Sequence, residues 1–555
     1  MGRRQAPGRA VSARTQAPPA LAPLPERPRV AEGTELDQGS DGGPSVVRTA
    51  DGRYVRVAAD MLRLLMLLDA TRTVDDLVDA LGAGRWDAGT VVRALESLQR
   101  AGFLDDGVMR GPARARLFTY VPPLTFQLTV ARPERAFEVA QPVTRVLLHR
   151  RVVVAALAFA AVGLVVLAVQ GGALLDALSR PLPLGALLAV VAASFLTTAL
   201  HEVGHGAALA YAGGRPSRLG VMLFYLTPAF FCDVTDGWRL RDRRARVRVA
   251  IAGIVVQLVA AAAASLAALV VGPERPDWRS ALLLFAASTV VTATMNLVPL
   301  VKLDGYIALM SHLDVPFLRE RAMTDARRAV ARALFGGRYA SELPDRPWAV
   351  PFGLASLLFP AVLVAAALGL WLPLVLGLGV VGAVLMVCLL AAVARFVLTE
   401  ASRVLAEALA AGASRARCAL VSGLVTVAVG AMAFTPVPYT VTGGFAQRDG
   451  GTQLVLARSA DADSLVPGTS VRLERRGIVA SRPLATVHVA GAPQPGTAPV
   501  VALFPVVDLE GELPVTIVRL TDTRPASATG FAVADAGTRP AWRWLYLNYL
   551  APFWR

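Results

Sequence analysis

Charged residues are scarce in this chain of 555 residues: they make up 17%, whereas ordinary soluble proteins have roughly a quarter. Cysteine is scarce too, and the three cysteines exclude a small scaffold held together by disulfides. Lysine occurs once, at Lys302, so arginine supplies nearly all of the basic residues, as is typical of a GC-rich bacterial genome. Hydrophobic residues make up 55%, which excludes a disordered or fibrous chain. The remaining class is a polytopic membrane protein with soluble attachments.

Seven apolar runs are long enough to cross a bilayer, for which a helix needs about 20 residues. They lie at 152–175, 184–211, 249–272, 280–301, 349–370, 374–394 and 418–434. The fifth and sixth share one uncharged stretch, which we expect the sequence Trp371-Leu372-Pro373 to break into two helices. The predicted fold class is therefore a polytopic α-helical membrane protein with about seven spans.

The distribution of basic residues predicts the orientation of these spans. If the N-terminus is cytoplasmic, the inside loops 212–248, 302–348 and 395–417 together carry 20 Lys and Arg residues, and the outside loops carry three. Cytoplasmic loops of membrane proteins are enriched in Lys and Arg. We therefore expect a multi-pass protein of the bacterial cell membrane, with a cytoplasmic N-terminus and everything after Phe434 outside.

Composition also changes along the soluble parts of the chain. After a short hairpin, residues 45–110 have the helical periodicity of a winged-helix-like domain, in which Thr73-Val74-Asp75-Asp76 is typical of a helix start. Short Val, Thr and Leu runs between turn-forming residues predict an extracytoplasmic β domain at 435–535. The full predicted organisation is a disordered arm at 1–44, the helical domain at 45–110, a linker at 111–151, a membrane core at 152–434, the β domain at 435–535 and an aromatic tail at 536–555. We expect this tail to lie at the membrane interface or to pack on the β domain.

The strongest motif is His201-Glu202-Val203-Gly204-His205, inside the second apolar run. Residues four apart stand on one face of a helix, so the two imidazoles can bind one Zn²⁺. Glu202 lies beside them and can take a proton from zinc-bound water as the catalytic base. Ionisable residues inside a membrane span are costly and indicate a functional site.

A catalytic zinc site needs a third protein ligand and an open position for water. The best candidate is Asp304, at the cytoplasmic end of the fourth run, because the second and fourth runs cross the membrane in the same direction and end at similar depths. Asp304 could instead be an interfacial carboxylate paired with Lys302. Cys232 and Asp233 are weaker candidates for metal ligands. We expect one catalytic Zn²⁺ bound by His201, His205 and Asp304.

These motifs resemble those of the site-2 proteases, a family of intramembrane zinc metalloproteases. Its first motif is HExxH, and its second is a helix break leading to Leu-Asp-Gly, which here is Leu303-Asp304-Gly305. The resemblance implies that both histidines and Asp304 bind zinc and that Glu202 activates water. It also implies that Asn296, eight residues before Asp304, assists at the substrate, and we place Lys302 and Gly305 in the same surroundings. Pro299 and the 253–257 segment depart from the family pattern, which indicates a divergent branch.

A closer resemblance extends over the whole chain, to the peptide zinc metalloproteases of ribosomal peptide maturation, such as the daptide group. It rests on residues 228–240 (PAFFCDVTDGWRL) and 298–306 (VPLVKLDGY), together with a PqqD-like stretch at 72–104. PqqD-like domains bind a leader peptide by adding it as a strand at a sheet edge. The resemblance implies an endopeptidase that removes the leader of a precursor peptide held by residues 45–110.

Two other functions remain open from the sequence. The enzyme could cleave a membrane-tethered regulator, or the chain could be a non-catalytic export adaptor with a structural zinc, because the β domain weakly resembles those of membrane-fusion adaptors. The expected partners are the precursor peptide, the lipid bilayer, and peptide-modifying enzymes or an exporter, with no nucleic acid. The apolar segment 219–232 is too short to span, so it is either a plain interfacial loop or a re-entrant segment that offers a strand edge to an unwound substrate.

Overall fold

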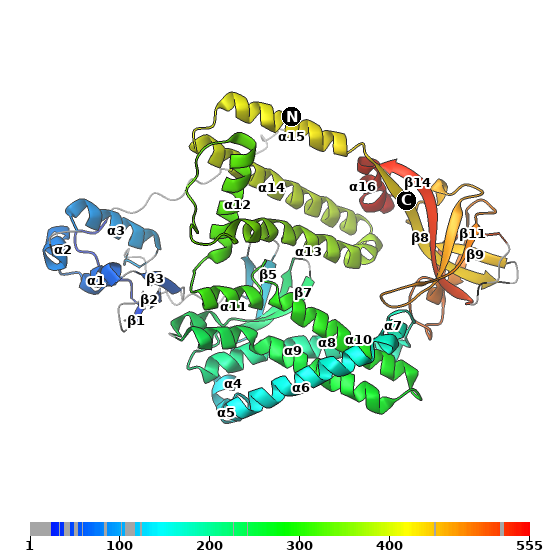
Figure 1. Cartoon of the computed structure of the whole chain (residues 1–555), viewed down its shortest axis with the longest axis horizontal. Coiled ribbons are helices and arrows are strands. Elements are labelled where there is room, and N and C mark those ends of the chain that lie inside the picture. The colour runs from blue at the N-terminus through cyan, green and yellow to red at the C-terminus, as the bar shows by residue number, and fades with distance from the viewer. Residues whose placement is uncertain are drawn as a thin grey trace, which may run out of the picture. The chain divides into compact units, whose positions relative to one another are not determined.

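The structure is a computed structural model in which the chain divides into two compact units, Met1–Leu117 and Phe118–Arg555 (Figure 1). It describes residues 24–32, 34–37, 45–48, 54–57, 59–82, 86–101, 103–105, 117–121, 125–225, 227–240, 242–448, 451–521, 525 and 527–554. Most of the expected disordered arm, 1–44, lies outside the described residues, although its Glu35–Asp37 forms strand β1.

The first unit combines a small antiparallel sheet with three helices. Its elements are β1, β2 (Ser45–Arg48), β3 (Tyr54–Val57), α1 (Ala59–Leu67), α2 (Val74–Leu81) and α3 (Ala88–Ala101), and the strand order is β1-β2-β3. Helix α2 begins with a capping box, in which the Thr73 hydroxyl accepts from the Asp76 amide and the Asp76 carboxylate accepts from the Thr73 amide. Leu64, Leu77 and Leu95 are fully buried in its core. The helical domain predicted after a short hairpin is present.

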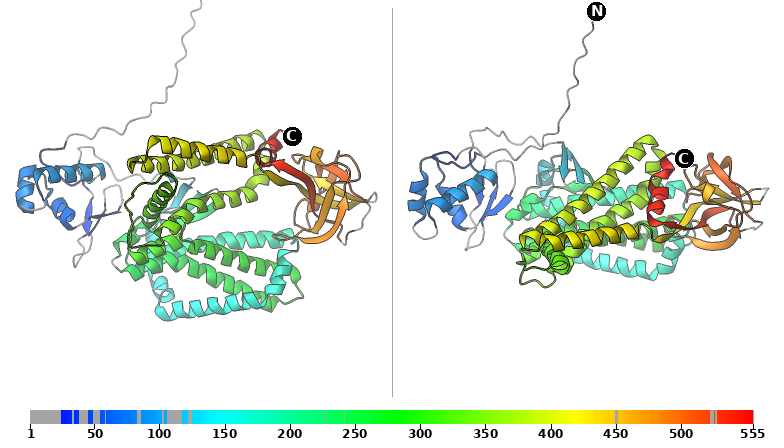
Figure 2. Two further views of the ribbon diagram at one scale, coloured as in Figure 1. Left: turned by 45° about the horizontal axis from the view of Figure 1, so that its top comes forward. Right: turned by 90° about the horizontal axis from the view of Figure 1, so that it is seen from above.

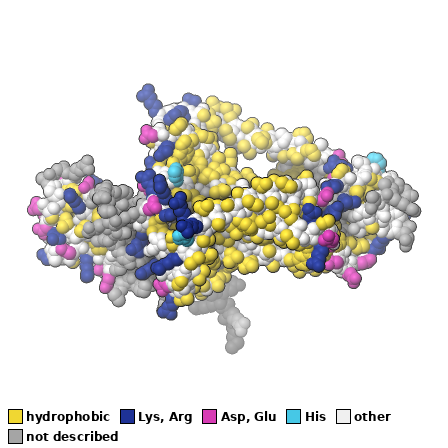
Figure 3. Space-filling view, turned by 60° about the horizontal axis from the view of Figure 1, so that its bottom comes forward, with side chains coloured by type: hydrophobic (Ala, Val, Ile, Leu, Met, Phe, Trp, Pro, Cys, Tyr) yellow, Lys and Arg dark blue, Asp and Glu magenta, His cyan; other side chains and the backbone are white. Residues whose placement is uncertain are grey.

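Among its described residues, the second unit contains seven helices that are long and apolar enough to cross a membrane. They are α6 (Arg150–Val169), α8 (Leu184–Tyr211), α9 (Arg243–Val271), α10 (Pro276–Leu297), α13 (Ala349–Gly377), α14 (Val380–Ala410) and α15 (Arg415–Met432). Figure 3 shows the apolar side chains as a broad band over these helices, with basic side chains toward both ends of the band. The seven predicted spans are confirmed as helices, and they indicate membrane insertion.

Shorter helices complete the helical part of this unit. They are α4 (Glu134–Val139), α5 (Gln141–Leu147), α7 (Gly171–Leu178), η1 (Thr235–Arg239), α11 (Asp304–Leu313) and α12 (Leu318–Phe335). The first predicted span ends earlier than expected, because α6 stops before Gln170 and α7 starts a new helix. In Figures 1 and 2, α6 to α11 form one group of helices and α12 to α15 a second.

The expected helix break at Trp371-Leu372-Pro373 is wrong. Helix α13 continues through position 373, and the chain turns at Leu378 and Gly379. Gly379 has a φ of 54°, a conformation that costs glycine little and other residues more. A proline removes one helical hydrogen bond, and here that does not end the helix, whereas the glycine supplies the backbone conformation that the turn requires.

The stretch expected to be a linker, 111–151, contains four secondary-structure elements of the second unit. Besides α4 and α5 these are β4 (Phe118–Val121) and β5 (Thr125–Ala131). They join β6 (Leu219–Phe224) and β7 (Thr227–Cys232) in an antiparallel sheet with the order β4-β5-β6-β7. The segment 219–232 is thus a hairpin, and β7 is an edge strand of this sheet.

The predicted C-terminal β domain is present as a seven-stranded antiparallel sheet with the order β11-β10-β14-β8-β9-β13-β12. Its elements are β8 (Pro436–Arg448), β9 (Gly451–Leu456), η2 (Ala462–Ser464), β10 (Ser470–Arg475), β11 (Arg482–His488), β12 (Gln494–Pro499), η3 (Val500–Ala502), β13 (Glu512–Arg519) and β14 (Thr529–Pro540). It contacts the helices near α7, where Arg482 pairs with Asp176 at 2.5 Å.

The aromatic tail forms α16 (Ala541–Tyr549) and η4 (Ala551–Phe553). Leu547 and Ala551 are buried in the core of the β domain, whereas Trp542 and Trp554 are exposed. The tail therefore packs on the β domain, one of the two predicted placements, and it still presents aromatic side chains outward.

Candidate metal centre

Helix α8 places His201 and His205 one turn apart on the same face, as the motif predicts. Their Nε2 atoms lie 3.0 Å apart, and both residues are buried. The Nδ1 atom of His205 lies 2.7 Å from the Val249 carbonyl of α9, so this nitrogen carries the proton and donates it. The Nε2 lone pair of His205 is therefore directed at the space between the two rings. Among the described residues, Nδ1 of His201 has no hydrogen-bond partner.

Asp304 reaches the same space from the first turn of α11. The chain leaves α10 at Leu297 and becomes extended at Leu303, which directs Asp304 back toward α8. Its Oδ2 lies 3.0 Å from His201 Nε2, and its Oδ1 lies 3.2 Å from His205 Nε2. All three ligand atoms lie within 4.8 Å of one another, and they could hold a metal ion.

The donor set of two imidazole nitrogens and one carboxylate fits Zn²⁺. Catalytic zinc sites have three protein ligands of these types and keep the fourth position for water or substrate. The fixed tautomer of His205 is the arrangement that metal-binding histidines adopt, because their second nitrogen donates to a carbonyl or carboxylate. The group of His201, His205 and Asp304 is the only set of three such ligands among the described residues.

Glu202 lies at the rim of this group and is held by the hairpin. Its Oε2 accepts a hydrogen bond of 2.7 Å from the backbone amide of Cys232, the last residue of β7. Its Oε1 is 3.9 Å from His201 Nε2, so the carboxylate lies near the ligand atoms without joining them. This is the position that a base for metal-bound water requires.

Cys232 and Asp233, the weaker ligand candidates, lie outside the group of His201, His205 and Asp304. Burial and the neighbouring carboxylates of Glu202 and Asp233 raise the pKa of the Cys232 thiol to about 12. The Asp233 carboxylate accepts hydrogen bonds from Ser217 and Arg218 at 2.9 and 3.1 Å. Neither residue belongs to the group of ligands.

The other residues predicted from the sequence, Asn296, Lys302 and Gly305, do not belong to the group of metal ligands. The Asn296 amide donates to Gln257 of α9 at 3.3 Å. Lys302 pairs with Glu320 at 2.7 Å, so it is not the partner of Asp304. Gly305 lies against the Leu297 carbonyl, where an added Cβ would approach the oxygen to 2.0 Å.

Gly253 of α9 has a role that sequence reasoning missed. A Cβ at this position would lie 2.6 Å from His205 Nε2 and 2.7 Å from His201 Cε1. The absence of a side chain therefore lets α9 lie directly against the two imidazoles. The signal in the sequence was a glycine inside an apolar span, which alone does not identify what it faces.

No known protein-family model matches the chain, and no curated protein or solved structure shows a significant match to it. No comparison therefore adds to the two motifs at 201–205 and 303–305. The convergence of these two motifs, about a hundred residues apart in the chain, is a property of the fold.

Proposed function

We propose that this protein is an intramembrane zinc endopeptidase. The observation that carries the proposal is the convergence of His201, His205 and Asp304 beside Glu202 in apolar helices. A structural zinc site is closed by four protein ligands, whereas three are found among the described residues, which favours catalysis over the export-adaptor alternative.

In this proposal His201, His205 and Asp304 hold the metal. When bound, zinc lowers the pKa of its water and polarises the carbonyl of the substrate. Glu202 accepts the proton of the attacking water and passes it to the amide nitrogen that leaves. The Cys232 amide fixes one carboxylate oxygen, so the other is free to face the water.

Strand β7 supports a way of presenting the substrate to this centre. Along an antiparallel edge strand, alternate residues direct their backbone groups outward. The Cys232 amide points outward to Glu202, so by alternation Phe230 and Pro228 are outward residues as well. Pro228 lacks an N–H, as is usual where proline occurs on a sheet edge. An extended peptide that adds to β7 would run past Glu202.

We propose a precursor peptide as the substrate, with removal of its leader as the reaction. The first unit supports this: it is compact, and β1 and β3 are the edge strands of its sheet, at which a leader could add as a further strand. The resemblance to a PqqD-like domain favours this substrate over a membrane-tethered regulator. The proposed location is the bacterial cell membrane, with the first unit cytoplasmic and the β domain outside.

The test is Glu202→Gln in the full-length protein, with metal content and proteolysis measured on the same preparation. We expect zinc to remain near one equivalent and cleavage of a co-expressed precursor to fall by about 10²-fold or more, because the base is lost and the ligands stay. Cleavage at the wild-type rate would refute the role of Glu202. Wild-type protein that binds no zinc would refute the metal centre itself.

A further inference from the structure

One face of the sheet β4-β5-β6-β7 is apolar and open. Phe118, Leu128, Val221 and Phe230 are directly paired across the four strands, so their side chains stand in one row on this face. Phe118 is 59% exposed and Leu128 46%. An exposed row of this kind, on a sheet that also supports Glu202, is a candidate interaction surface.

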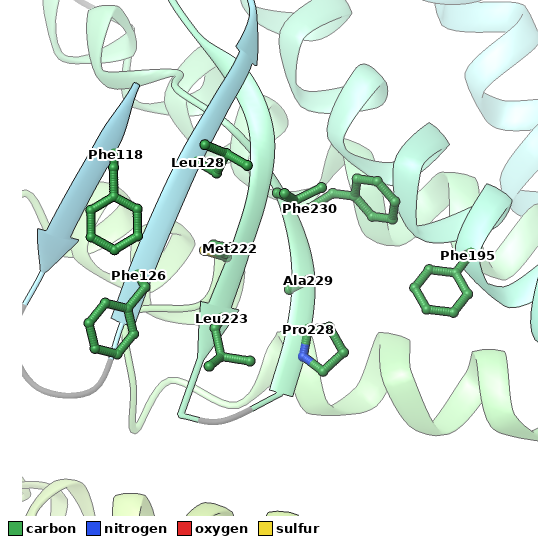
Figure 4. A pocket seen from close by; sticks show the side chains of 10 residues that line it. Phe118, Phe126, Leu128, Phe195, Met222, Leu223, Pro228, Ala229 and Phe230 are labelled. Atoms are coloured by element: carbon green, nitrogen blue, oxygen red, sulfur yellow. The ribbon is translucent and has the colours of Figure 1, made fainter. Parts of the chain in front are cut away.

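This face is hollowed next to α8. The hollow has a volume of about 330 Å³ and is lined by aromatic and aliphatic side chains of the four strands and by Phe195 of α8 (Figure 4). Phe195 meets Phe230 edge to face, with ring centroids 6.3 Å apart. The hollow is large enough for one aromatic or long aliphatic side chain.

Two independent measures place the hollow close to the metal centre. Phe230 lies two residues before Cys232, which is about 7 Å along a strand. Phe195 lies seven residues before Glu202, which is two turns or about 10 Å along α8 and on the same helix face. Side chains on this face of β7 and α8 therefore extend from the hollow toward Glu202.

We propose that this hollow is a specificity pocket, which receives a large apolar side chain of the peptide two residues from the position next to Glu202. The inference rests on the proposed protease function. In a strand added to β7, the residue opposite Phe230 projects its side chain from the same face as Phe230, and so over the hollow. The Cys232 amide already donates to Glu202, so the added strand pairs with β7 as far as Phe230, and its residue two positions along lies next to Glu202. The enzyme therefore selects Phe, Leu or Met at one fixed distance from the bond that it cuts.

The test uses the full-length enzyme in phosphatidylcholine–phosphatidylglycerol vesicles and a library of apolar peptides randomised around a central segment. Cleavage sites are read by mass spectrometry. Leu128→Trp fills the hollow from an exposed position, and Val130→Trp is the matched control, because Val130 lies on the same strand, is 70% exposed and does not line the hollow.

We expect the wild type and Val130→Trp to favour large apolar residues at one position by about 10-fold or more over alanine, and Leu128→Trp to reverse this preference at that position alone. An unchanged profile for Leu128→Trp, or an equal loss on all peptides, would overturn the pocket.

A second measurement separates this inference from the protease activity. Benzoylphenylalanine in place of Phe118, an exposed aromatic residue of the lining, in a Glu202→Gln background, is irradiated with the Phe-containing and Ala-containing peptides. Preferential crosslinking to the Phe-containing peptide supports the pocket even without turnover. Crosslinks to lipid alone would assign the hollow to acyl chains and overturn the proposal. If crosslinking is selective and the wild type cleaves no peptide, the protease function fails and the binding site stands.

Discussion

At the scale of single residues, the metal centre depends on a position without a side chain as much as on its ligands. Three ligands come from α8 and α11, and Gly253 of α9 lies against both imidazoles. The Val249 carbonyl, one turn earlier on α9, accepts the proton of His205. Helix α9 thus orients the ligands although it contributes none.

Gly253→Ala is expected to lower zinc content and activity together, because a methyl group within 2.7 Å of both rings forces the helices apart or rotates the histidines. Metal analysis of the purified variant measures this loss. Gly185→Ala, on α8, is the control, since a Cβ there meets nothing within 4 Å. Equal zinc content in the two variants would show that α9 does not constrain the ligands.

Asp304→Ala is expected to reduce the zinc content and to abolish proteolysis, because one of the three protein ligands is removed. Lys302→Ala serves as its matched control: Lys302 is two residues away and pairs with Glu320, so its loss leaves the ligands in place. Stoichiometric zinc in Asp304→Ala, measured by elemental analysis, would mean that the third ligand is another residue.

At the scale of secondary-structure elements, the hairpin of β6 and β7 connects the centre to the rest of the second unit. Strand β6 pairs with β5, a segment ahead of the first span, and β7 ends at Cys232, whose amide donates to Glu202. The sheet therefore joins residues around 125 to Glu202, so the stretch that we expected to be a linker supports the candidate site.

The capping box of α2 gives a prediction at this scale. Thr73→Ala removes the side-chain acceptor for the Asp76 amide and should destabilise the start of α2 by about 1 kcal/mol. The measurement is hydrogen exchange of the α2 amides in the full-length protein. We expect these amides to exchange about fivefold faster in Thr73→Ala than in the wild type. Thr73→Ser retains the acceptor and should exchange at nearly the wild-type rate; equal acceleration in both variants would contradict the capping role.

At the scale of the whole molecule, the boundary between the two units shows which residues can be deleted without interrupting the second unit. The first unit ends at Leu117, and β4 begins the second at Phe118. A tethered recognition domain raises the local concentration of its peptide to the mM range for a short linker. Under the proposed function, the first unit therefore makes the encounter between the precursor and the candidate site more frequent, and it does not change the chemical step.

Deleting residues 1–117 should impair cleavage of a full precursor far more than cleavage of a leaderless peptide, with zinc content unchanged. The ratio of the two rates, in full-length and truncated enzyme, measures the effect, and an unchanged ratio would reject leader recognition. Deleting residues 1–131 is the contrasting variant, because it also removes β4 and β5 and leaves β6 paired on one side only, with β7. We expect that variant to lose activity on both peptides.

Much of this architecture was predictable because its signals are local in the sequence. Long apolar runs reveal the spans, and the spacing of four between His201 and His205 places both on one helix face. Asp304 was predicted as their partner because two spans of the same direction end at similar depth. The turn after α13 lies at Gly379, which has the positive φ, and not at the proline that the sequence pattern indicates.

The sequence by itself determined the number of spans, the domain order and the candidate ligands, because periodicity and apolar length act within one segment. Only the tertiary structure decided that Gly253 lies against the histidines, that Lys302 pairs with Glu320, and that β5 completes the sheet beside Glu202. Each of these depends on which segments meet in space. Contacts between distant segments leave no periodic signal in a single sequence, so packing alone decides them.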